Sequence, residues 1–299
     1  MTNPPLVSVI IPCYRAGRYV RETLDAVRAQ THSHWEILLC EDGVLDDTAQ
    51  QVAAFAATTT NPVRVFQNPT NLGVSRTRNR LIDEARGTFI AFVDADDLWP
   101  ADYLAKSLER MAAAQADWQI GGAELIDENG RPLGGQIIPP VVPAAAIPTE
   151  LLKHSFILPS AVVAHRNVFD GGLRFDSNFP IGEDLDLWIR VIRAGFKPLI
   201  VAEPLIRYRK HPTSATSNPV RFPEEFSRVL ERYLGDSIVD QKLCRANVST
   251  MLTSVARMTW RQDPPRALKA LHRLFRVAPF HVQAWPFFVM AKVAQLTSS

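Results

Sequence analysis

Residues 89–97 read Phe-Ile-Ala-Phe-Val-Asp-Ala-Asp-Asp, so an apolar run stops abruptly in three carboxylates within four positions. A short run that is apolar throughout is typical of a strand buried on both faces of a sheet. Three like charges so close together repel one another, and burial adds to the repulsion, so a bound cation is the simplest compensation. Mg²⁺ or Mn²⁺, held by one or two carboxylates and completed by substrate phosphate oxygens, matches so sparse a site.

Helix capping is the structural alternative for part of this stretch. Asp96 or Asp97 could cap a helix beginning at Leu98-Trp99-Pro100, since Asp at the N-cap and Pro in the first turn are common. Capping explains one aspartate and leaves the other two without a reason. We therefore predict a metal site here and expect Asp97 to cap the helix that follows.

Upstream of this stretch, short β-branched apolar runs alternate with amphipathic segments of helical period. The expected strands are 7–11, 36–40, 63–66 and 89–93, and the expected helices are 18–30, 48–57 and 74–86. This alternation predicts βαβ units and a buried, mostly parallel central sheet flanked by helices. Polar residues follow three of the strands, at Pro12-Cys13-Tyr14, Glu41-Asp42-Gly43 and 94–97. Because ligands of such sheets bind at the carboxyl ends of the strands, three loops should converge on one rim.

The second half of the chain has a different organisation. Residues 127–148 contain five prolines, which interrupt regular hydrogen bonding, so we expect a long loop there. A strand is expected at 162–164, and a helix at 182–194 that places Trp188 in an apolar face. Beyond about residue 217 the pattern is helical, with breaks at 263–265 and at Pro279. We expect a catalytic domain over 1–216, with halves 1–104 and 105–216, and a helical extension over 217–299.

Composition narrows the class of protein. The chain has 299 residues, with 33 basic and 31 acidic side chains, and this balance lacks the basic excess of a nucleic-acid binder. Three scattered cysteines fit neither a metal motif nor a disulfide framework. The first residues do not resemble a signal peptide, and 284–296 is too short to span a bilayer and contains Lys292. A cytoplasmic location is expected.

Residues 71–79 form a second candidate site. A turn at Asn71-Leu72-Gly73 leads into a helix start that carries Arg76 and Arg78. Free backbone N–H groups and guanidinium groups there suit a diphosphate or a buried carboxylate. Taken alone, the segment is better explained as a glycine turn followed by a solvated basic face.

In their order along the chain, these motifs resemble those of inverting family-2 glycosyltransferases of the GT-A fold. The family has strands ending in Pro-x-Tyr-Asn, Asp-Asp-Gly-Ser and Asp-x-Asp-Asp, and an Asn-x-Gly-x-x-x-Ala-Arg-Asn segment before the last of these. The match is strong over residues 6–104 and resumes at 182–188 and at 208–211, covering roughly two-thirds of the chain. It implies a GT-A fold with a nucleotide-sugar donor.

The resemblance assigns a donor pocket. Asp42 would accept a hydrogen bond from the nucleobase, normally uracil in this family, with Pro12 and Tyr14 shaping the pocket. Arg78 would belong to the donor site. Four positions depart from the pattern and leave the nucleotide's identity open, with UDP favoured; they are Arg15, Val44, Thr77 and Leu81.

The resemblance also assigns the metal and the base. Asp94 would lie by the ribose and metal, Asp96 would bind Mn²⁺ or Mg²⁺, and His211 would approach the metal or diphosphate. Asp184 would be the general base, although Glu183 and Asp186 compete for that role. Alone, Asp184 is an ordinary acidic residue of a first helical turn, and His211 an ordinary surface histidine. One base and one cation suffice for a single in-line displacement.

The acceptor side is harder to assign. Residues 157–161 and Trp188 could line an acceptor cleft, although the spacing of Trp188 is that of a core stripe. The acceptor is expected to be a saccharide or a lipid-linked sugar, in cell-surface polysaccharide or glycolipid synthesis. The basic residues of 266–276 and the aromatics of 285–288 suggest either peripheral contact with the inner face of the membrane or packing and homodimer contacts.

Three rival functions compete with an active transferase. A nucleotide-sugar-binding scaffold of the same fold, acting through its C-terminal helices, is the main alternative, and the complete set of acidic residues favours an active enzyme. A glycoside hydrolase would need two carboxylates flanking the bond. A nucleotidyltransferase would usually carry a glycine-rich, basic N-terminal loop, which residues 12–17 do not form.

Overall fold

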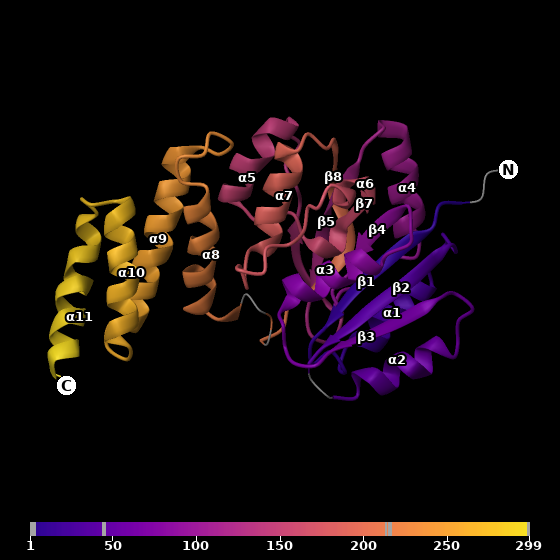
Figure 1. Cartoon of the computed structure of the whole chain (residues 1–299), viewed down its shortest axis with the longest axis horizontal. Coiled ribbons are helices and arrows are strands. Elements are labelled where there is room, and N and C mark those ends of the chain that lie inside the picture. Colours follow the sequence, from indigo (N-terminus) through magenta and orange to yellow (C-terminus); the bar gives the residue numbers. More distant parts are fainter. Residues whose placement is uncertain (1–3, 44–45, 213, 215–216, 298–299) are drawn as a thin grey trace. The chain divides into compact units, whose positions relative to one another are not determined.

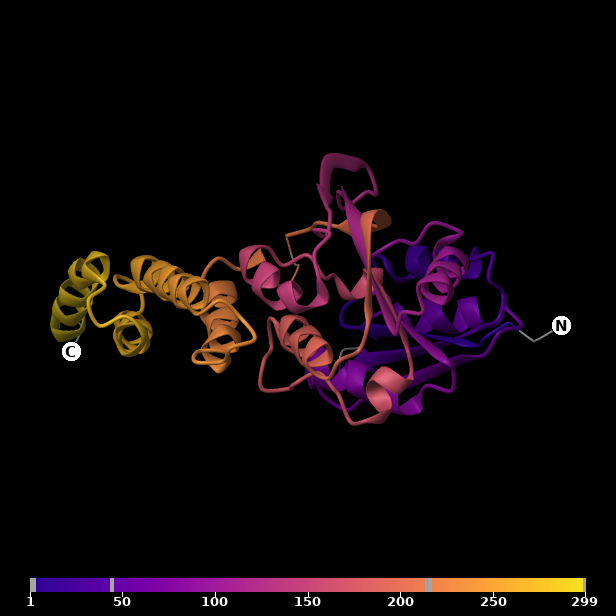
Figure 2. The ribbon, with the colours of Figure 1, turned by 90° about the horizontal axis from the view of Figure 1, so that it is seen from above.

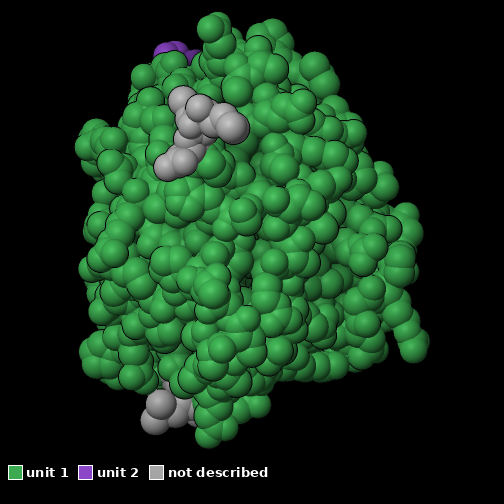
Figure 3. All heavy atoms as spheres, turned by 90° about the vertical axis from the view of Figure 1, so that its right-hand side faces the viewer, with its two compact units in different colours: residues 1–147, 155–211 green, residues 148–154, 212–299 purple. Residues whose placement is uncertain are grey.

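The computed structural model describes residues 4–43, 46–212, 214 and 217–297, so Val44 lies outside the described residues. The chain divides into two compact units, one of residues 1–147 and 155–211 and the other of residues 148–154 and 212–299 (Figure 1). Figure 3 shows one face of the first unit, which we call unit 1, as spheres. The second is unit 2.

The first half of unit 1 is the βαβ arrangement that the sequence predicts. Four parallel strands lie in the order β3-β2-β1-β4, joined by helices that the chain forms between them. The strands are β1 (Val7–Cys13), β2 (Trp35–Asp42), β3 (Val63–Asn68) and β4 (Phe89–Phe92), and the helices are α1 (Val20–Arg28), α2 (Thr48–Ala56) and α3 (Val74–Glu84). Both β1 and β2 are buried along nearly their whole length, which explains their continuous apolar character.

The second half of unit 1 extends the same sheet with mixed pairing. Strand β7 (Val162–His165) pairs antiparallel with β4 and with β5 (Trp118–Ile126), and β8 (Pro198–Arg209) runs parallel to β5. The prediction of a long loop over 127–148 is wrong, because β6 (Pro132–Ile137) pairs antiparallel with β5 within it. Proline is tolerated there because β6 lies at the end of the strand order and Pro132 begins it.

Helices cover the sheet of unit 1. The helices of this half are α4 (Tyr103–Ala114), α6 (Asn167–Asp170) and α7 (Glu183–Arg193), with a short 3₁₀ turn at Pro159–Ala161. The expected helix start at Leu98 is wrong, since α4 begins five residues later. Trp188 of α7 is fully buried and stacks on Trp118 with ring centroids 5.2 Å apart, so it belongs to the core and does not line an acceptor cleft.

Unit 2 is helical and has its own core. After a 3₁₀ turn (Ala144–Ala146), α5 (Ile147–Lys153) enters it, and helices adjacent in the sequence from α8 to α11 pack on one another (Figure 2). These helices are α8 (Arg221–Arg232), α9 (Gln241–Thr259), α10 (Pro264–Val277) and α11 (Trp285–Thr297). The predicted break at 263–265 is the start of α10, where the Asp263 side chain accepts from the backbone N–H of Arg266.

Two expectations from the composition concern the cysteines and helices that could span a membrane. The three cysteines are buried and free. Within the described helices, none combines the length and the apolar character needed to cross a membrane.

Candidate active site

The three aspartates that follow β4 lie in three different environments. The side chains of Asp94 and Asp96 are each 31% exposed, whereas Asp97 is fully buried. The Asp96 carboxylate lies 2.8 Å from Nε2 of His211, so residues 115 positions apart, both predicted from the family motif, meet in one site. The His211 ring also lies against Tyr19, with centroids 5.3 Å apart.

Asp97 is buried and connects two segments of the chain through hydrogen bonds, so its predicted role as a helix cap is wrong. One carboxylate oxygen accepts from the Ser160 hydroxyl, and the other accepts from the backbone N–H of Arg209 at 3.0 Å. The Ser160 oxygen in turn accepts from the backbone N–H of Asp94 at 3.0 Å. Burial raises the pKa of Asp97, and the nearby charges of Asp96 and Asp94 raise it further.

Arg209 also holds the loop that carries Asp94, Asp96 and Asp97. The sequence alone does not identify it as a functional residue. Its Nε donates to the backbone oxygen of Asp96 at 2.8 Å, and its Nη2 pairs with Glu22 at 2.8 Å. The guanidinium also lies over the Tyr19 ring, 4.7 Å from its centroid. The Tyr-Arg-Lys-His motif contains Arg209, but spacing alone could not show that it points inward while His211 faces Asp96.

Arg78 links the aspartate loop to the start of α7. Its side chain is 4% exposed, and its two terminal nitrogens contact Asp94 at 2.6 Å and Glu183 at 2.8 Å. Burial lowers the pKa of Arg78, but the charges of Asp94 and Glu183 outweigh that effect and raise it above its ordinary value. The sequence suggests a diphosphate or a buried carboxylate as the partner of the arginines in this segment. In the structure, the partners of Arg78 are two carboxylates.

Among the three acidic residues of α7, Asp184 differs from its neighbours. Glu183 is buried against Arg78, and burial, followed by repulsion from Asp184, raises the pKa of Glu183 to about 7. Asp186 is fully buried and pairs with Arg190 at 2.7 Å. Asp184 is partly exposed, forms no ion pair within the described residues, and has its pKa raised by burial. It is therefore the carboxylate best placed to meet a substrate.

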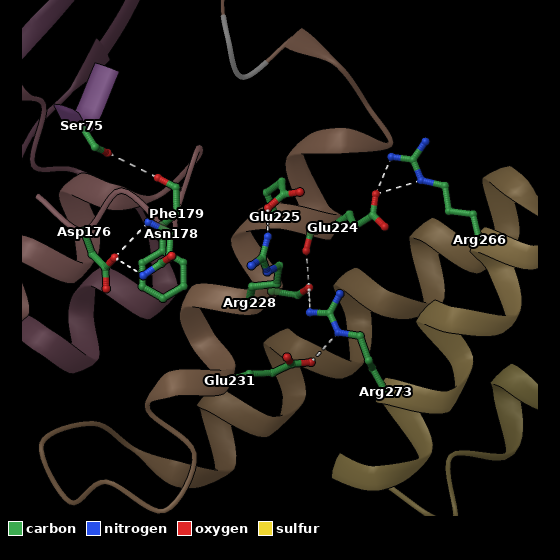
Figure 4. Close-up of polar contacts among 11 residues, drawn as sticks. Ser75, Asp176, Asn178, Phe179, Glu224, Glu225, Arg228, Glu231, Arg266 and Arg273 are labelled. Carbon is green, nitrogen blue, oxygen red and sulfur yellow. Dashed lines mark hydrogen bonds and ion pairs between the residues drawn. The ribbon is translucent and has the colours of Figure 1, made fainter. Parts of the chain in front are cut away.

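Helix α3 fixes the segment that leads into α7. Asn79 exchanges two hydrogen bonds with the backbone of Phe175, each 2.8 Å long. The Ser75 hydroxyl lies 3.5 Å from the Phe179 carbonyl (Figure 4). In the turn before α7, the Asp176 carboxylate accepts a hydrogen bond from the side-chain amide of Asn178. The first turns of α3 therefore position both Arg78 and the start of α7.

Asp42 holds the turn that precedes α3. Its carboxylate accepts from the backbone N–H groups of Leu72 and Gly73, both at 2.8 Å, and from the Asn68 amide at 2.9 Å. A carboxylate offers about four acceptor positions, so one more N–H can be accommodated. Thr77, one of the departures from the family pattern, is buried and donates to the Gly73 carbonyl at 3.1 Å, which reinforces the same turn.

Tyr14 and Pro12 lie at the end of β1. Tyr14 is 49% exposed and Pro12 is partly exposed, so both are accessible. Arg15, another departure, has a backbone φ of 52° and places its guanidinium 5.4 Å from the Tyr14 ring centroid. At the predicted nucleobase pocket, Tyr14 is therefore about half exposed, with the Arg15 guanidinium over its ring.

The residues present suit a divalent cation only in part. No group of three or more His, Cys, Asp and Glu side chains is arranged to hold an ion within the described residues. Asp96, with Asp94 in the same loop, supplies hard carboxylate oxygens that fit Mn²⁺ or Mg²⁺ if other oxygens complete the shell, whereas the His211 imidazole is a donor more typical of softer metal ions than of Mg²⁺. Phosphate oxygens of a bound substrate would be the natural source.

Sequence comparison relates the chain to one family of known proteins. Residues 8–170 match the model of the family described as "Glycosyl transferase family 2". The chain is similar to "Putative teichuronic acid biosynthesis glycosyltransferase TuaG" of Bacillus subtilis (strain 168), with 31% identity over 73% of this chain and 84% of that protein. It is also similar to "UDP-Glc:alpha-D-GlcNAc-diphosphoundecaprenol beta-1,3-glucosyltransferase WfgD" of Escherichia coli, with 30% identity over 63% of this chain and 70% of that protein.

A solved structure shows the same fold. The chain resembles S. aureus TarS 1–349, solved in complex with UDP-GlcNAc, with a TM-score of 0.69. The match covers 91% of this chain and 81% of TarS 1–349, at 18% sequence identity, a level at which the likeness concerns the fold. The predicted α/β fold with a central sheet, flanking helices and a C-terminal helical part is confirmed.

Proposed function

The chain belongs to glycosyl transferase family 2, and from that premise we propose an inverting, metal-dependent transfer of a hexosyl group from a UDP-sugar to an acceptor hydroxyl. The observation that carries the proposal is the contact between Asp96 and His211, next to Asp94 in the same loop. Mn²⁺ or Mg²⁺ bound there would neutralise the charge that develops on the departing nucleoside diphosphate.

The donor side of the proposal rests on three groups. Asp42 has an acceptor position left for a nucleobase N–H, and Tyr14 offers an exposed ring at the end of β1. Arg78, which contacts Asp94 and Glu183 and is nearly fully buried, would hold the Asp94 carboxylate in place for a ribose or a metal ion. UDP as the nucleotide is supported by the names of WfgD and of the TarS complex.

Asp184 is the proposed general base. Inversion requires one in-line displacement, so a single carboxylate that removes the proton of the acceptor hydroxyl suffices. Glu183 and Asp186 are each buried in an ion pair, which leaves Asp184 as the partly exposed carboxylate of α7. Burial raises the pKa of Asp184. As the pH is lowered, the rate of transfer should therefore begin to fall at a higher pH than it would with an unperturbed aspartate as the base.

The proposed acceptor is a saccharide or a lipid-linked sugar, in the synthesis of cell-surface polysaccharide or glycolipid. TuaG is named for teichuronic acid biosynthesis, and the name of WfgD specifies an undecaprenol-diphosphate-linked acceptor. Both names support this class of acceptor for a chain that shares their family.

The test is a panel of UDP-, GDP- and dTDP-sugars, measured for binding and for slow donor hydrolysis with Mn²⁺, Mg²⁺ or chelator. Asp96→Ala should abolish metal-dependent donor binding, whereas Asp184→Asn should preserve binding and reduce transfer by about a hundredfold or more. Asp102→Ala is the matched control, since this aspartate precedes α4 and its side chain is 47% exposed.

Three results would oppose the proposal in different ways. Failure of every nucleotide sugar to bind with metal would remove it. Full transfer by Asp184→Asn would reassign the base. Donor binding without hydrolysis or transfer to any acceptor would favour the alternative of a nucleotide-sugar-binding scaffold.

A further inference from the structure

The last part of unit 2 has an unusual charge pattern. Residues 264–299 contain five lysines and arginines and no aspartate or glutamate. Two of the cations face inward: Arg266 pairs with Glu224, and Arg273 pairs with Glu231 at 3.0 Å and donates to Ser227 (Figure 4). The basic character that the sequence assigns to α10 is therefore partly neutralised by α8.

The other three cations remain on the surface. Lys269 and Arg276 are exposed two turns apart on α10, and Lys292 is exposed on α11. Helix α11 packs against α10 through aromatic contacts, with Phe275 stacked on Trp285 at 5.0 Å between ring centroids and His272 against Phe288 at 6.0 Å. These contacts place the exposed cations of α10 on a helix that directly adjoins α11.

Helix α11 and the residues just before it also expose apolar side chains. Trp285, Val289 and Leu296 follow one another at spacings of four and seven residues, which puts them on one face of the helix. They are 48%, 57% and 78% exposed, and Phe280 and Val282, just before the helix, are 92% and 72% exposed. Clustered exposure of this kind marks an interaction site, in contrast to scattered apolar residues. We call these five residues the α11 apolar face.

We propose that the α11 apolar face binds the surface of an anionic phospholipid bilayer, with Lys269, Arg276 and Lys292 contacting the lipid headgroups. A bilayer offers anionic headgroups and apolar chains together, which matches the exposed apolar residues of the α11 apolar face and the exposed cations on α10 and α11. A second copy of this chain matches less well, because pairing the faces would bring like charges together. Helix α11 has 13 residues, a length suited to lying in the interface.

Vesicle binding requires neither donor nor acceptor, so this surface acts independently of the proposed transfer reaction. The experiment is flotation of the full chain with vesicles of phosphatidylcholine alone or of about two parts phosphatidylcholine to one of phosphatidylglycerol. We expect binding to the anionic vesicles only, weakening as salt is raised, because exposed charges are screened. Nucleotide-sugar binding, measured in parallel, reports on unit 1 separately.

Matched variants locate the surface. Val289→Ser with Leu296→Ser should weaken vesicle binding at least about tenfold, since both side chains would lose apolar burial. Lys269→Gln with Arg276→Gln should weaken it about fivefold per cation removed. The controls are Val65→Ser and Val141→Ser, exposed apolar positions of unit 1 at 50% and 77%, which should bind vesicles as the unaltered chain does.

The proposal is overturned by any of three results. These are equal binding to neutral and anionic vesicles, unchanged binding of the α11 variants, and a concentration-dependent dimer in light scattering that the α11 variants abolish while vesicles bind nothing. Circular dichroism and thermal unfolding of each variant distinguish loss of the surface from loss of the fold. Leu296→Ser is the safest single change, because that side chain is already 78% exposed.

Discussion

The carboxyl group of Asp97 joins segments that are far apart in the sequence. It accepts from Ser160, in the 3₁₀ turn directly before β7, and from the backbone N–H of Arg209 at the end of β8. Arg209 lies two residues before His211. Both donors are buried, so removal of the carboxyl group would leave each of them without this acceptor in a site that water does not reach. Asp97 thus positions both the Asp94 backbone, through Ser160, and the strand that carries His211.

Asp97→Ala should lower the free energy of unfolding by about 3 kcal/mol, because each buried donor left without an acceptor costs about 1–3 kcal/mol. Asp97→Asn keeps the size of the side chain and one acceptor oxygen, so its loss should be smaller. Urea unfolding measures both, and Asp102→Ala again serves as the exposed control. In the Asn variant, the loss of donor-binding free energy should exceed the loss of unfolding free energy. If the Ala variant were as stable as the unaltered chain, this role of Asp97 would be contradicted.

The sequence could identify the polar residues of the site but only part of what each contacts. The spacing of the three aspartates alone predicts a metal site, whereas the separate roles of Asp94 and Asp96, and the role of His211, follow only from the ordered motifs of a family. Ser160 and Arg209 were missed as functional supports, because their partners lie 63 and 112 positions away along the chain. No local pattern encodes contacts over such separations.

At the scale of elements, the turn after β2 shows how closely the backbone segments of the donor side approach. Gly43 has a φ of +77°, and a Cβ atom built on it would lie 2.1 Å from the Thr70 carbonyl carbon. Thr70 immediately precedes the turn that Asp42 holds through Leu72 and Gly73. A side chain at position 43 would therefore push that turn away from Asp42.

Gly43→Ala should destabilise the chain and weaken donor binding, whereas Gly172→Ala should only destabilise it. Gly172 has a φ of +87°, and a methyl group added there would meet no atom within 4 Å, so it shares the backbone penalty of about 1–2 kcal/mol without the clash. The two variants are compared by denaturant unfolding and by nucleotide-sugar titration. Equal donor affinity in both would show that the contact with Thr70 is unimportant for binding.

The helices of the first half were predictable from their regular period, and β1 and β2 from short continuous apolar runs, which suit strands buried on both faces. Strands β5, β6 and β8 escaped prediction because their local sequence is less regular. Pro132 suggested a loop, yet β6 tolerates proline at its first residue, and β8 shifts register against β5 around Gly121 and Gly122. The pairing of β8 with β5 is long-range, so it is decided by tertiary contacts and not by local propensity.

The proposed site and the proposed membrane surface belong to different units. Asp42, Asp94, Asp184 and His211 all lie in unit 1, and the α11 apolar face lies in unit 2. Each unit has a hydrophobic core of its own, around β1 and β2 in one and around Leu252 and Leu271 in the other. Chains of this kind often unfold in more than one transition.

Leu271→Ala should therefore lower the unfolding temperature of unit 2 alone. Leu271 is fully buried in α10, and truncating a buried leucine costs about 2–5 kcal/mol. A nucleotide sugar with metal should raise only the transition of unit 1, because a ligand stabilises the unit that binds it. Calorimetry with and without donor measures both shifts, and donor affinity of Leu271→Ala at low temperature should equal that of the unaltered chain. A single transition that moves with both the mutation and the ligand would instead mean that the two units fold as one, in which case changes on α11 would also alter donor binding.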